Sequence, residues 1–310
     1  MSNQFKPHPY QQECINAIIE RPGVALWLEM GLGKTVVTLT AIAALLQLSD
    51  VSKVLIIAPK KVAEATWQDE AKKWEHLQGL RMSTVLGTAK QRERALSKKA
   101  DIYITNRDNV VWLEKRYGRR WPFDMVVLDE ASSFKHHSTQ RFKALRRMRP
   151  HINRVVELTG TPAPKDYMDL WAQVYLLDQG QRLGQRFTQY RDNYFQPDKR
   201  NGMQIYSWKP RKGAEEAIQA KLADVAISIQ AADHLQLPEI QLMGCLTVFV
   251  SINHIYGKLF IFHYVFIIPL TKDPVNKIKT CQAKTSQHKG LGYGNSHNHK
   301  HYGKKYHGLF

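Results

Sequence analysis

A glycine-rich stretch near the N-terminus has the residue types that bind phosphate groups. Glu29–Thr35 reads EMGLGKT and lies between an apolar run and a helical pattern. Glycines let backbone amides come close to phosphate oxygens, and the free amides and dipole at the start of a helix attract the anion. Lys34 would neutralise the β- and γ-phosphates of a nucleotide, and the Thr35 hydroxyl would ligate Mg²⁺. The strict pattern has glycine at the position of Leu28, so a plain glycine-rich turn with a surface lysine is the alternative.

An acidic pair follows a second apolar run. Met125–Leu128 are apolar, and Asp129 and Glu130 come directly after them. A buried strand would deliver both carboxylates to one edge of a sheet. There Asp129 would hold Mg²⁺, commonly through water, and Glu130 would orient and deprotonate an attacking water. Alone, such a pair is usually a solvated helix cap; together with the phosphate loop it completes one site, with Glu130, Asp129 and Lys34 as its catalytic residues.

A third stretch, Leu158–Pro164, reads LTGTPAP and also follows an apolar run. Its small hydroxyl residues and glycine would let a loop pass close under a nucleotide while donating hydrogen bonds to Asp129 or Glu130. Prolines also stiffen ordinary turns between a strand and a helix. The spacing alone leaves both interpretations open.

These stretches stand in a chain that alternates apolar runs with helical patterns. The apolar runs are continuous, which is typical of strands covered on both faces. We expect strands over Val24–Leu28, Val54–Ala58, Arg81–Leu86, Asp101–Thr105, Met125–Leu128 and Val155–Leu158. We expect helices over Lys34–Leu46, Val62–Trp74, Ala89–Ser97, Thr139–Met148 and Asp166–Leu177. The alternation predicts an α/β fold with a parallel sheet, helices on both faces, and ligands at the carboxyl ends of the strands.

The composition of the chain excludes some classes of protein and favours others. The 310 residues predict about two domains. With 43% hydrophobic and 23% charged residues, wholesale disorder is excluded. A net charge of +18 favours a polyanionic partner, either nucleic acid or an anionic membrane surface. Three separated cysteines (Cys14, Cys245 and Cys281) exclude a disulfide framework and a CxxC zinc site, and the polar N-terminus lacks a secretory signal, so we expect a cytoplasmic protein without disulfides.

The charge is unevenly distributed along the chain. Residues 1–243 carry a net charge of +10, while residues 244–310 carry +8, contain no arginine and hold seven of the 13 histidines. We therefore expect three regions: a nucleotide-binding lobe over 1–180, a helical, basic extension over 181–243, and an aberrant or low-complexity Lys/His-rich tail over 244–310.

The tail has two features of its own. Cys245–Leu270 is long and apolar, but a central Lys258 and three further polar residues make a membrane span costly. Buried strands, or a segment with no stable fold, are the favoured interpretations. The last histidines could bind a divalent metal adventitiously, and a disordered tail that binds polyanions weakly is favoured over that; they are His297, His299, His301 and His307.

Six short motifs occur in a fixed order: PYQ from Pro9, EMGLGKT, IIAPKKV, ITNRDN, LDEAS and LTGTPAP. Over residues 5–240 this set resembles the first RecA-like lobe of superfamily-two, DEAD/DEAH-type helicase-related ATPases. It is closest to the Swi/Snf-like branch, in particular the compact phage and prophage forms. The resemblance implies a RecA-like P-loop domain that binds ATP and Mg²⁺ and belongs to a DNA-dependent ATPase or translocase. DNA is the implied partner, with RNA left open.

The resemblance also implies roles for individual residues. Gln11 would recognise adenine, with Tyr10 or a neighbouring aromatic residue stacking on the base. The nucleotide-binding set is then Gln11, Gly31, Leu32, Gly33, Lys34 and Thr35. The loop that couples nucleotide state to nucleic-acid grip would be Thr159, Gly160 and Thr161. The residues placed where the family contacts one phosphate backbone are Lys60, Lys61, Asn106 and Arg107, beside Pro59 and Thr105.

The chain departs from the family pattern in two places. Ser132 stands where histidine is frequent, which leaves the two acids intact. Residues after 240 do not resemble the second lobe that supplies an arginine finger, and the change near Met243–Gly244 suggests a truncated or frame-shifted gene, or a divergent tail. A non-catalytic module that holds nucleotide and DNA is therefore the alternative to an enzyme. Trp208, in the basic run Ser207–Lys212, is the one tryptophan that we keep as a candidate for stacking on bases.

Overall fold

The structure is a computed structural model that describes residues 3–160, 167–201, 204–230, 244–251 and 261–268. The chain divides into two units, Met1–Gln236 and Leu237–Phe310. The first unit holds all of the predicted site residues.

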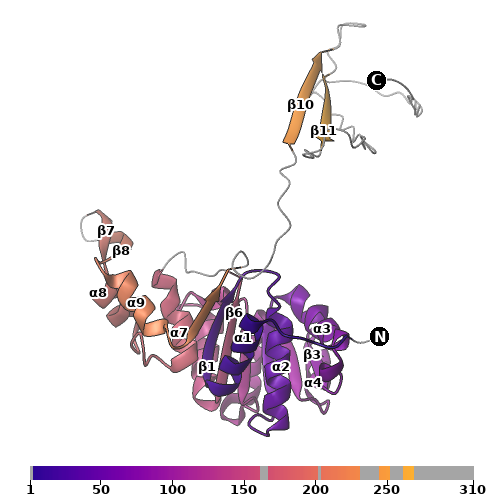
Figure 1. The fold of residues 1–310 in the computed structure, drawn as a ribbon. Coiled ribbons are helices and arrows are strands. Elements are labelled where there is room, and N and C mark those ends of the chain that lie inside the picture. The colour runs from indigo at the N-terminus through magenta and orange to yellow at the C-terminus, as the bar shows by residue number, and fades with distance from the viewer. Residues whose placement is uncertain (1–2, 161–166, 202–203, 231–243, 252–260, 269–310) are drawn as a thin grey trace, which may run out of the picture. The chain divides into compact units, whose positions relative to one another are not determined.

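A parallel sheet forms the centre of the first unit, with the strand order β3-β4-β2-β5-β6-β1-β9 (Figure 1). Its strands are β1 (Gly23–Leu28), β2 (Val54–Ala58), β3 (Met82–Val85), β4 (Ile102–Asn106), β5 (Met125–Asp129), β6 (Arg154–Thr159) and β9 (Ala226–Ile229). Every residue of β2 and of β4 is buried, as continuous apolar runs predict for strands covered on both faces. The predicted α/β class and the six predicted strands are confirmed.

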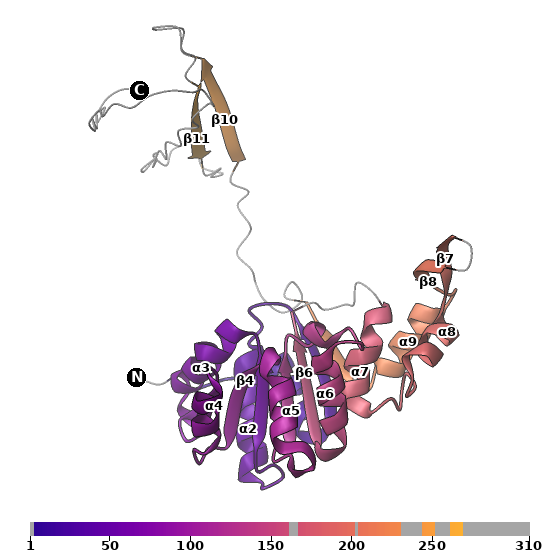
Figure 2. The ribbon, with the colours of Figure 1, turned by 180° about the vertical axis from the view of Figure 1, so that it is seen from behind.

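Helices cover both faces of the sheet. The face seen in front in Figure 1 carries α1 (Pro9–Glu20), α2 (Lys34–Gln47) and α3 (Trp67–Lys73), whose buried side chains share one core cluster. The opposite face, in front in Figure 2, carries α4 (Ala89–Leu96), α5 (Val110–Tyr117), α6 (Gln140–Met148) and α7 (Leu170–Asp178), which share a second cluster. The sheet is therefore packed between two cores.

Two of the predicted helices begin differently from the expectation. The pattern over Val62–Trp74 opens with a π-helical turn, Val62–Thr66, and α3 follows from Trp67. The α-helical part of the last predicted helix starts at Leu170, after a 3₁₀ turn. Sequence periodicity does not distinguish such turns, because they shift a side chain by only a fraction of a helical turn.

The region 181–230 contains more than the predicted helices. It has α8 (Phe187–Tyr194), a hairpin of β7 (Phe195–Asn201) and β8 (Gln204–Pro210), and α9 (Ala214–Leu222). Its last described element, β9, lies beside β1 at the edge of the main sheet, from Ala25↔Ala226 to Leu28↔Ile229. This strand lies at the sheet edge and is only partly buried, and it was not predicted.

One acid lies in the apolar interior. The Glu157 side chain, in the middle of β6, is 2% exposed, and its Oε1 atom has no hydrogen-bond partner within the described part of the chain. Burial raises the pKa of Glu157 well above 4.5, the charge of Asp178 adds to this effect, and Arg149 opposes it. The Arg149 guanidinium itself donates to three backbone carbonyls, those of Leu176, Ile152 and Leu177.

In the second unit the structure describes two antiparallel strands, β10 (Gly244–Ser251) and β11 (Ile261–Ile268), paired from Gly244↔Ile268 to Ser251↔Ile261. Cys281 and the histidines from His288 onward lie outside the described residues. Among the described residues, no helix combines the length and apolar character that crossing a membrane requires.

Candidate nucleotide-binding site

The sheet topology brings the three chemistry-bearing stretches to one edge. Strand β6 lies between β1 and β5, and all three run parallel. Thr159 pairs with Trp27 near the end of β1, and Leu158 pairs with Asp129 at the end of β5. The phosphate loop, the acidic pair and the start of the LTGT stretch therefore leave the sheet side by side.

The phosphate loop depends on two glycines with left-handed backbone. Gly31 has φ 87° and Gly33 has φ 78°, a region that residues with a side chain rarely adopt. Gly33 caps the N-terminus of α2, and a Cβ atom there would lie 2.6 Å from Nε2 of Gln11. Gly33 is therefore required for its left-handed conformation, and a side chain there would also displace the Gln11 amide.

Helix α1 is tied to the phosphate loop through the carbonyl of Leu32. Gln11 Nε2 donates to this oxygen at 3.3 Å and the Tyr10 hydroxyl donates to it at 3.4 Å. Gln11 is 7% exposed, and its Oε1 accepts from the backbone N–H of His8 at 2.9 Å. In this arrangement the Gln11 amide supports the loop, so its predicted contact with adenine stays a prediction.

Lys34 reaches across the mouth of the loop. Its ammonium donates to the carbonyls of Leu28 at 2.8 Å and Glu29 at 3.1 Å. An ammonium has three donors, so a phosphate oxygen can accept from the third. Burial lowers the pKa of Lys34, and the negative charges of Glu130 and Asp129 oppose this shift. The sheet topology places the lysine and both acids at the same edge, where they can act on one ligand.

Asp129 is half-buried at the end of β5. Its Oδ2 accepts a hydrogen bond from the indole Nε1 of Trp67 at 3.0 Å. Burial raises the pKa of Asp129, the indole N–H opposes that rise, and the charge of Glu130 adds to it. The indole thus orients the carboxylate and stabilises its ionised form, which is the form that binds Mg²⁺.

Glu130 has an unusual backbone conformation, with φ 59° and ψ 60°. For a residue other than glycine, this left-handed conformation costs about 1–3 kcal/mol and is often found at functional sites. It turns the chain out of β5 into a 3₁₀ turn over Ala131–Phe134. A Cβ at Gly160 would lie 3.9 Å from Glu130 Oε1, so the LTGT stretch passes beside this carboxylate. Thr159 is buried at the end of β6, while Thr161 lies outside the described residues.

The predicted nucleic-acid residues lie at the same edge, after β2 and β4. These strands pair with Ala58 opposite Asn106, so the loops that follow them are neighbours. Lys60 and Lys61 are exposed and Arg107 is half-buried. Asn106 is 8% exposed: its Nδ2 donates to Asp108, and its Oδ1 has no hydrogen-bond partner among the described residues.

A comparison with family models decides the classification. Residues 10–225 match the SNF2-related domain. The chain belongs to the SNF2-related domain family. The match covers the sheet except for β9, together with the phosphate loop and the acidic pair, and the predicted Swi/Snf-like resemblance is confirmed.

The SNF2-related chain also resembles individual proteins. It is 37% identical over 242 residues to putative protein p41 of Acyrthosiphon pisum secondary endosymbiont phage 1, covering 76% of this chain and 53% of that protein. It is 34% identical over 172 residues to the mouse DNA excision repair protein ERCC-6-like, covering 53% of this chain and 14% of that protein. The chain thus spans about half of the phage relative and a small part of the mouse one.

The fold matches that of a solved structure, the Sulfolobus solfataricus SWI2/SNF2 ATPase core in complex with dsDNA. The TM-score is 0.60 at 21% identity, covering 74% of this chain and 45% of that one. At this identity the likeness establishes the fold of the lobe.

Trp67 is the site residue that sequence reasoning missed. Its side chain is fully buried. It is also a hydrogen-bond donor to Asp129, which lies 62 positions later in the chain. Its position soon after IIAPKKV is the only signal in the sequence, and that signal does not specify a partner.

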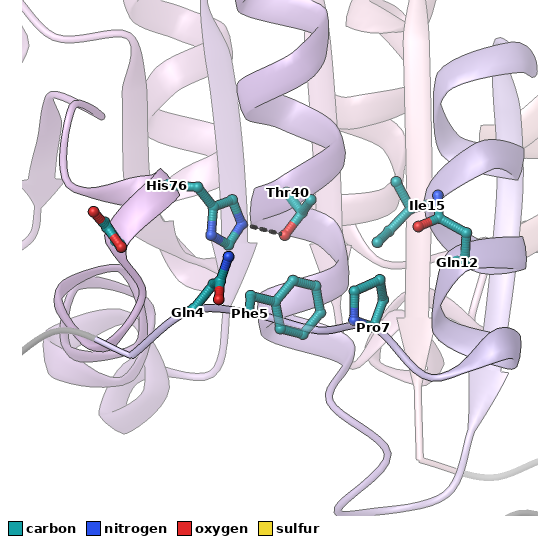
Figure 3. Close-up of a pocket in the computed structure, with 8 residues that line it drawn as sticks. Gln4, Phe5, Pro7, Gln12, Ile15, Thr40 and His76 are labelled. Carbon is teal, nitrogen blue, oxygen red and sulfur yellow. Dashed lines mark hydrogen bonds between the residues drawn. The ribbon is translucent and has the colours of Figure 1, made fainter.

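A separate pocket of about 430 Å³ lies beside α1 and α2 (Figure 3). Phe5, Gln12, Thr40 and His76 are among its lining residues, and none of the predicted site residues line it. His76 Nε2 and Thr40 Oγ1 lie 2.9 Å apart, which ties the turn after α3 to α2.

Proposed function

We propose that this SNF2-related lobe binds ATP with Mg²⁺ and is the ATP-binding part of a DNA-dependent ATPase or translocase. One observation carries the proposal: the glycine loop that opens α2 and carries Lys34 leaves the sheet at the same edge as Asp129 and Glu130, because β1 and β5 run parallel on either side of β6. A cation, a metal-binding carboxylate and a second carboxylate beside it are the parts that phosphoryl transfer needs.

Each of these residues would have a separate task. The amides of the loop and Lys34 would hold the phosphates, while Thr35 and Asp129 would hold Mg²⁺ through oxygen atoms. The donor set fits the metal, because the half-buried Asp129 carboxylate is oriented by Trp67 and supplies the oxygen ligands that Mg²⁺ prefers. The metal would neutralise charge on the phosphates. Glu130 would accept the proton of the attacking water, held in place by the strained turn behind it.

Nucleic acid would bind at the loops after β2 and β4. The exposed Lys60 and Lys61 support this proposal, and so does the half-buried Arg107 beside them. Replacing both lysines by Gln should lower the log–log salt slope of DNA binding by about 1.4 to 1.8, since each phosphate contact contributes roughly 0.7–0.9. Lys72 and Lys73 are the matched control, because both are exposed and pair with Asp69 and Glu70 on their own helix. An equal change of the salt slope in both double variants would exclude the loop after β2 as a contact for nucleic acid.

We further propose that this chain alone hydrolyses ATP only slowly. The charge that develops on the transferring phosphoryl group is stabilised in related systems by an arginine finger, worth about 10³–10⁵ in rate. Residues 244–310 contain no arginine, so that segment cannot supply one. The alternative function, a non-catalytic module that holds nucleotide and DNA, follows from the same observation.

Phosphate release separates the alternatives. The rate should be measured for the full chain with and without DNA, with Glu130→Gln as the blank. A rate slightly above the blank, unchanged by DNA, agrees with a lobe that needs another subunit or domain. A rate of phosphate release equal to that of the blank would favour the alternative function, a non-catalytic module that holds nucleotide and DNA. Strong stimulation by DNA would contradict slow hydrolysis, and would mean that this chain or a second copy provides the missing cation.

A further inference from the structure

The β7–β8 hairpin extends from the lobe beyond α8 and α9 (Figures 1 and 2). It is strongly basic: residues 195–212 contain five lysines and arginines and a single acid, Asp198. Lys199 and Lys209 are exposed. Asp198 offsets this charge only weakly, because it lies 3.7 Å from the Lys209 ammonium and accepts from the Ser207 hydroxyl at 3.1 Å.

The base of the hairpin is fixed to the lobe by its aromatic face. Phe195 is 1% exposed and belongs to the larger core cluster, and Trp208 packs against that cluster. The guanidinium of Arg191, from α8, lies 4.4 Å from the centre of the Trp208 ring. Trp208, the candidate for base stacking from the sequence, is therefore already used to hold the hairpin on α8.

Tyr206 lies two positions nearer the turn than Trp208. The pairing of β7 with β8 is irregular there and skips Tyr206. Its side chain is 62% exposed, although its size and apolar ring would normally favour burial. The neighbouring Ile205 is 38% exposed.

The two lysines lie near this ring along the hairpin. Lys209 pairs with Gln196, and Lys199 pairs with Ser207, the neighbour of Tyr206 in β8. The hairpin thus presents an exposed aromatic ring and two exposed lysines within a short stretch of its two strands. A strand of nucleic acid that follows the hairpin would meet both, with a base on the ring and phosphates on the ammonium groups.

We propose that the β7–β8 hairpin binds single-stranded nucleic acid, with a base stacked on Tyr206 and phosphates contacted by Lys199 and Lys209. A single strand is favoured over a duplex, because a ring can stack only on a base whose face is free. This inference rests on the proposed nucleic-acid binding of the lobe and adds a second contact point, distant in sequence from the loops after β2 and β4.

Photo-crosslinking tests the contact directly. The full chain would be irradiated with a dT₂₀ strand that carries 5-iodouracil, and the crosslinked peptide identified by mass spectrometry. We expect a crosslink at Tyr206. Crosslinks found only in the loops after β2 and β4, or only in residues 244–310, would overturn the hairpin contact while leaving the proposed function in place.

Affinity measurements separate the ring from the charge. Tyr206→Ala should weaken binding to dT₂₀ about five-fold or more, since stacking on an aromatic ring is worth roughly 1–3 kcal/mol per base. Tyr206→Phe keeps the ring and should bind as the wild type does. Binding to a duplex of equal length should change little in either variant. Lys199→Gln with Lys209→Gln should reduce the salt slope, measured against the Lys72→Gln, Lys73→Gln control.

The outcomes are distinguishable. If the wild type binds dT₂₀ and Tyr206→Ala binds equally well, the hairpin proposal is wrong and the proposed function stands. If the wild type shows no salt-dependent binding to either DNA, both fail. Binding of a fluorescent ATP analogue, unchanged in Tyr206→Ala, would show that the variant is folded.

Discussion

Trp67→Phe probes the hydrogen bond that orients Asp129. The substitution keeps an aromatic ring in a fully buried position and removes the indole N–H that lies 3.0 Å from Asp129 Oδ2. A hydrogen bond to a charged group is worth about 1.5–3 kcal/mol. Losing a partner that orients a metal ligand typically weakens metal affinity 10- to 100-fold. We therefore expect the Mg²⁺ dependence of ATP binding to shift to roughly 10-fold higher Mg²⁺ or more.

The pH dependence should change as well. The indole lowers the pKa of Asp129 against the rise caused by burial, so the variant should have a still higher pKa. A higher pKa means that the ionised, metal-binding form appears only at higher pH. Mg²⁺-dependent ATP binding by Trp67→Phe should therefore be lost at a higher pH than in the wild type as the solution is acidified.

A matched control exists in the same unit. Trp171 is equally buried, and its Nε1 donates to the carbonyl of Gly184 at 2.9 Å, on the opposite face of the sheet. Trp171→Phe removes the same atoms and a hydrogen bond of similar length, so it carries a similar cost in stability. Fluorescent ATP analogue titrations at several Mg²⁺ concentrations would compare the three proteins. Equal Mg²⁺ dependence in both variants would refute the role that we give to Trp67.

Three further changes test other parts of the account. Gly33→Ala should abolish binding of the ATP analogue, because its Cβ would lie 2.6 Å from Gln11 Nε2 on a backbone with φ 78°; binding like the wild type would show that the loop adopts another conformation. Gln11→Ala should weaken both analogue binding and thermal stability, since it frees the Leu32 carbonyl and the His8 N–H; loss of binding with unchanged stability would favour direct recognition of the base. Because burial raises the pKa of Glu157, its contribution to stability is fully present below pH 4.5 and is lost as pH rises through the folded-state pKa. In urea unfolding, the free energy of unfolding of Glu157→Gln minus that of the wild type should therefore be larger at pH 8 than at pH 5. An equal difference at the two pH values would contradict this.

The sequence predicted the centre of the sheet well because its strands are continuous apolar runs. Runs such as Val54–Ala58 and Met125–Leu128 are apolar at every position, and each of these residues is buried. The residues that end these strands could be predicted for the same reason, since parallel strands place Asp129 and Lys34 at one edge.

What sequence could not predict depends on contacts between distant residues. The bond between Trp67 and Asp129 joins residues 62 positions apart, and no local pattern encodes it. The β7–β8 hairpin was missed because Pro197 and an irregular register interrupt the alternation of its side chains. The left-handed backbone of Glu130 was also unpredictable, because glutamate adopts it only when the surrounding fold imposes it.

Titration of a fluorescent ATP analogue with Mg²⁺ into the wild type and Lys34→Ala tests the central claim most directly. Lys34 is only half-buried, and its ammonium bonds to two carbonyls of the loop, so its loss should leave the fold intact, which circular dichroism would check. We expect saturable binding by the wild type and a large loss of affinity in the folded variant. Equal affinity in the two proteins would contradict the assignment of this loop as the phosphate site of an ATP-binding lobe.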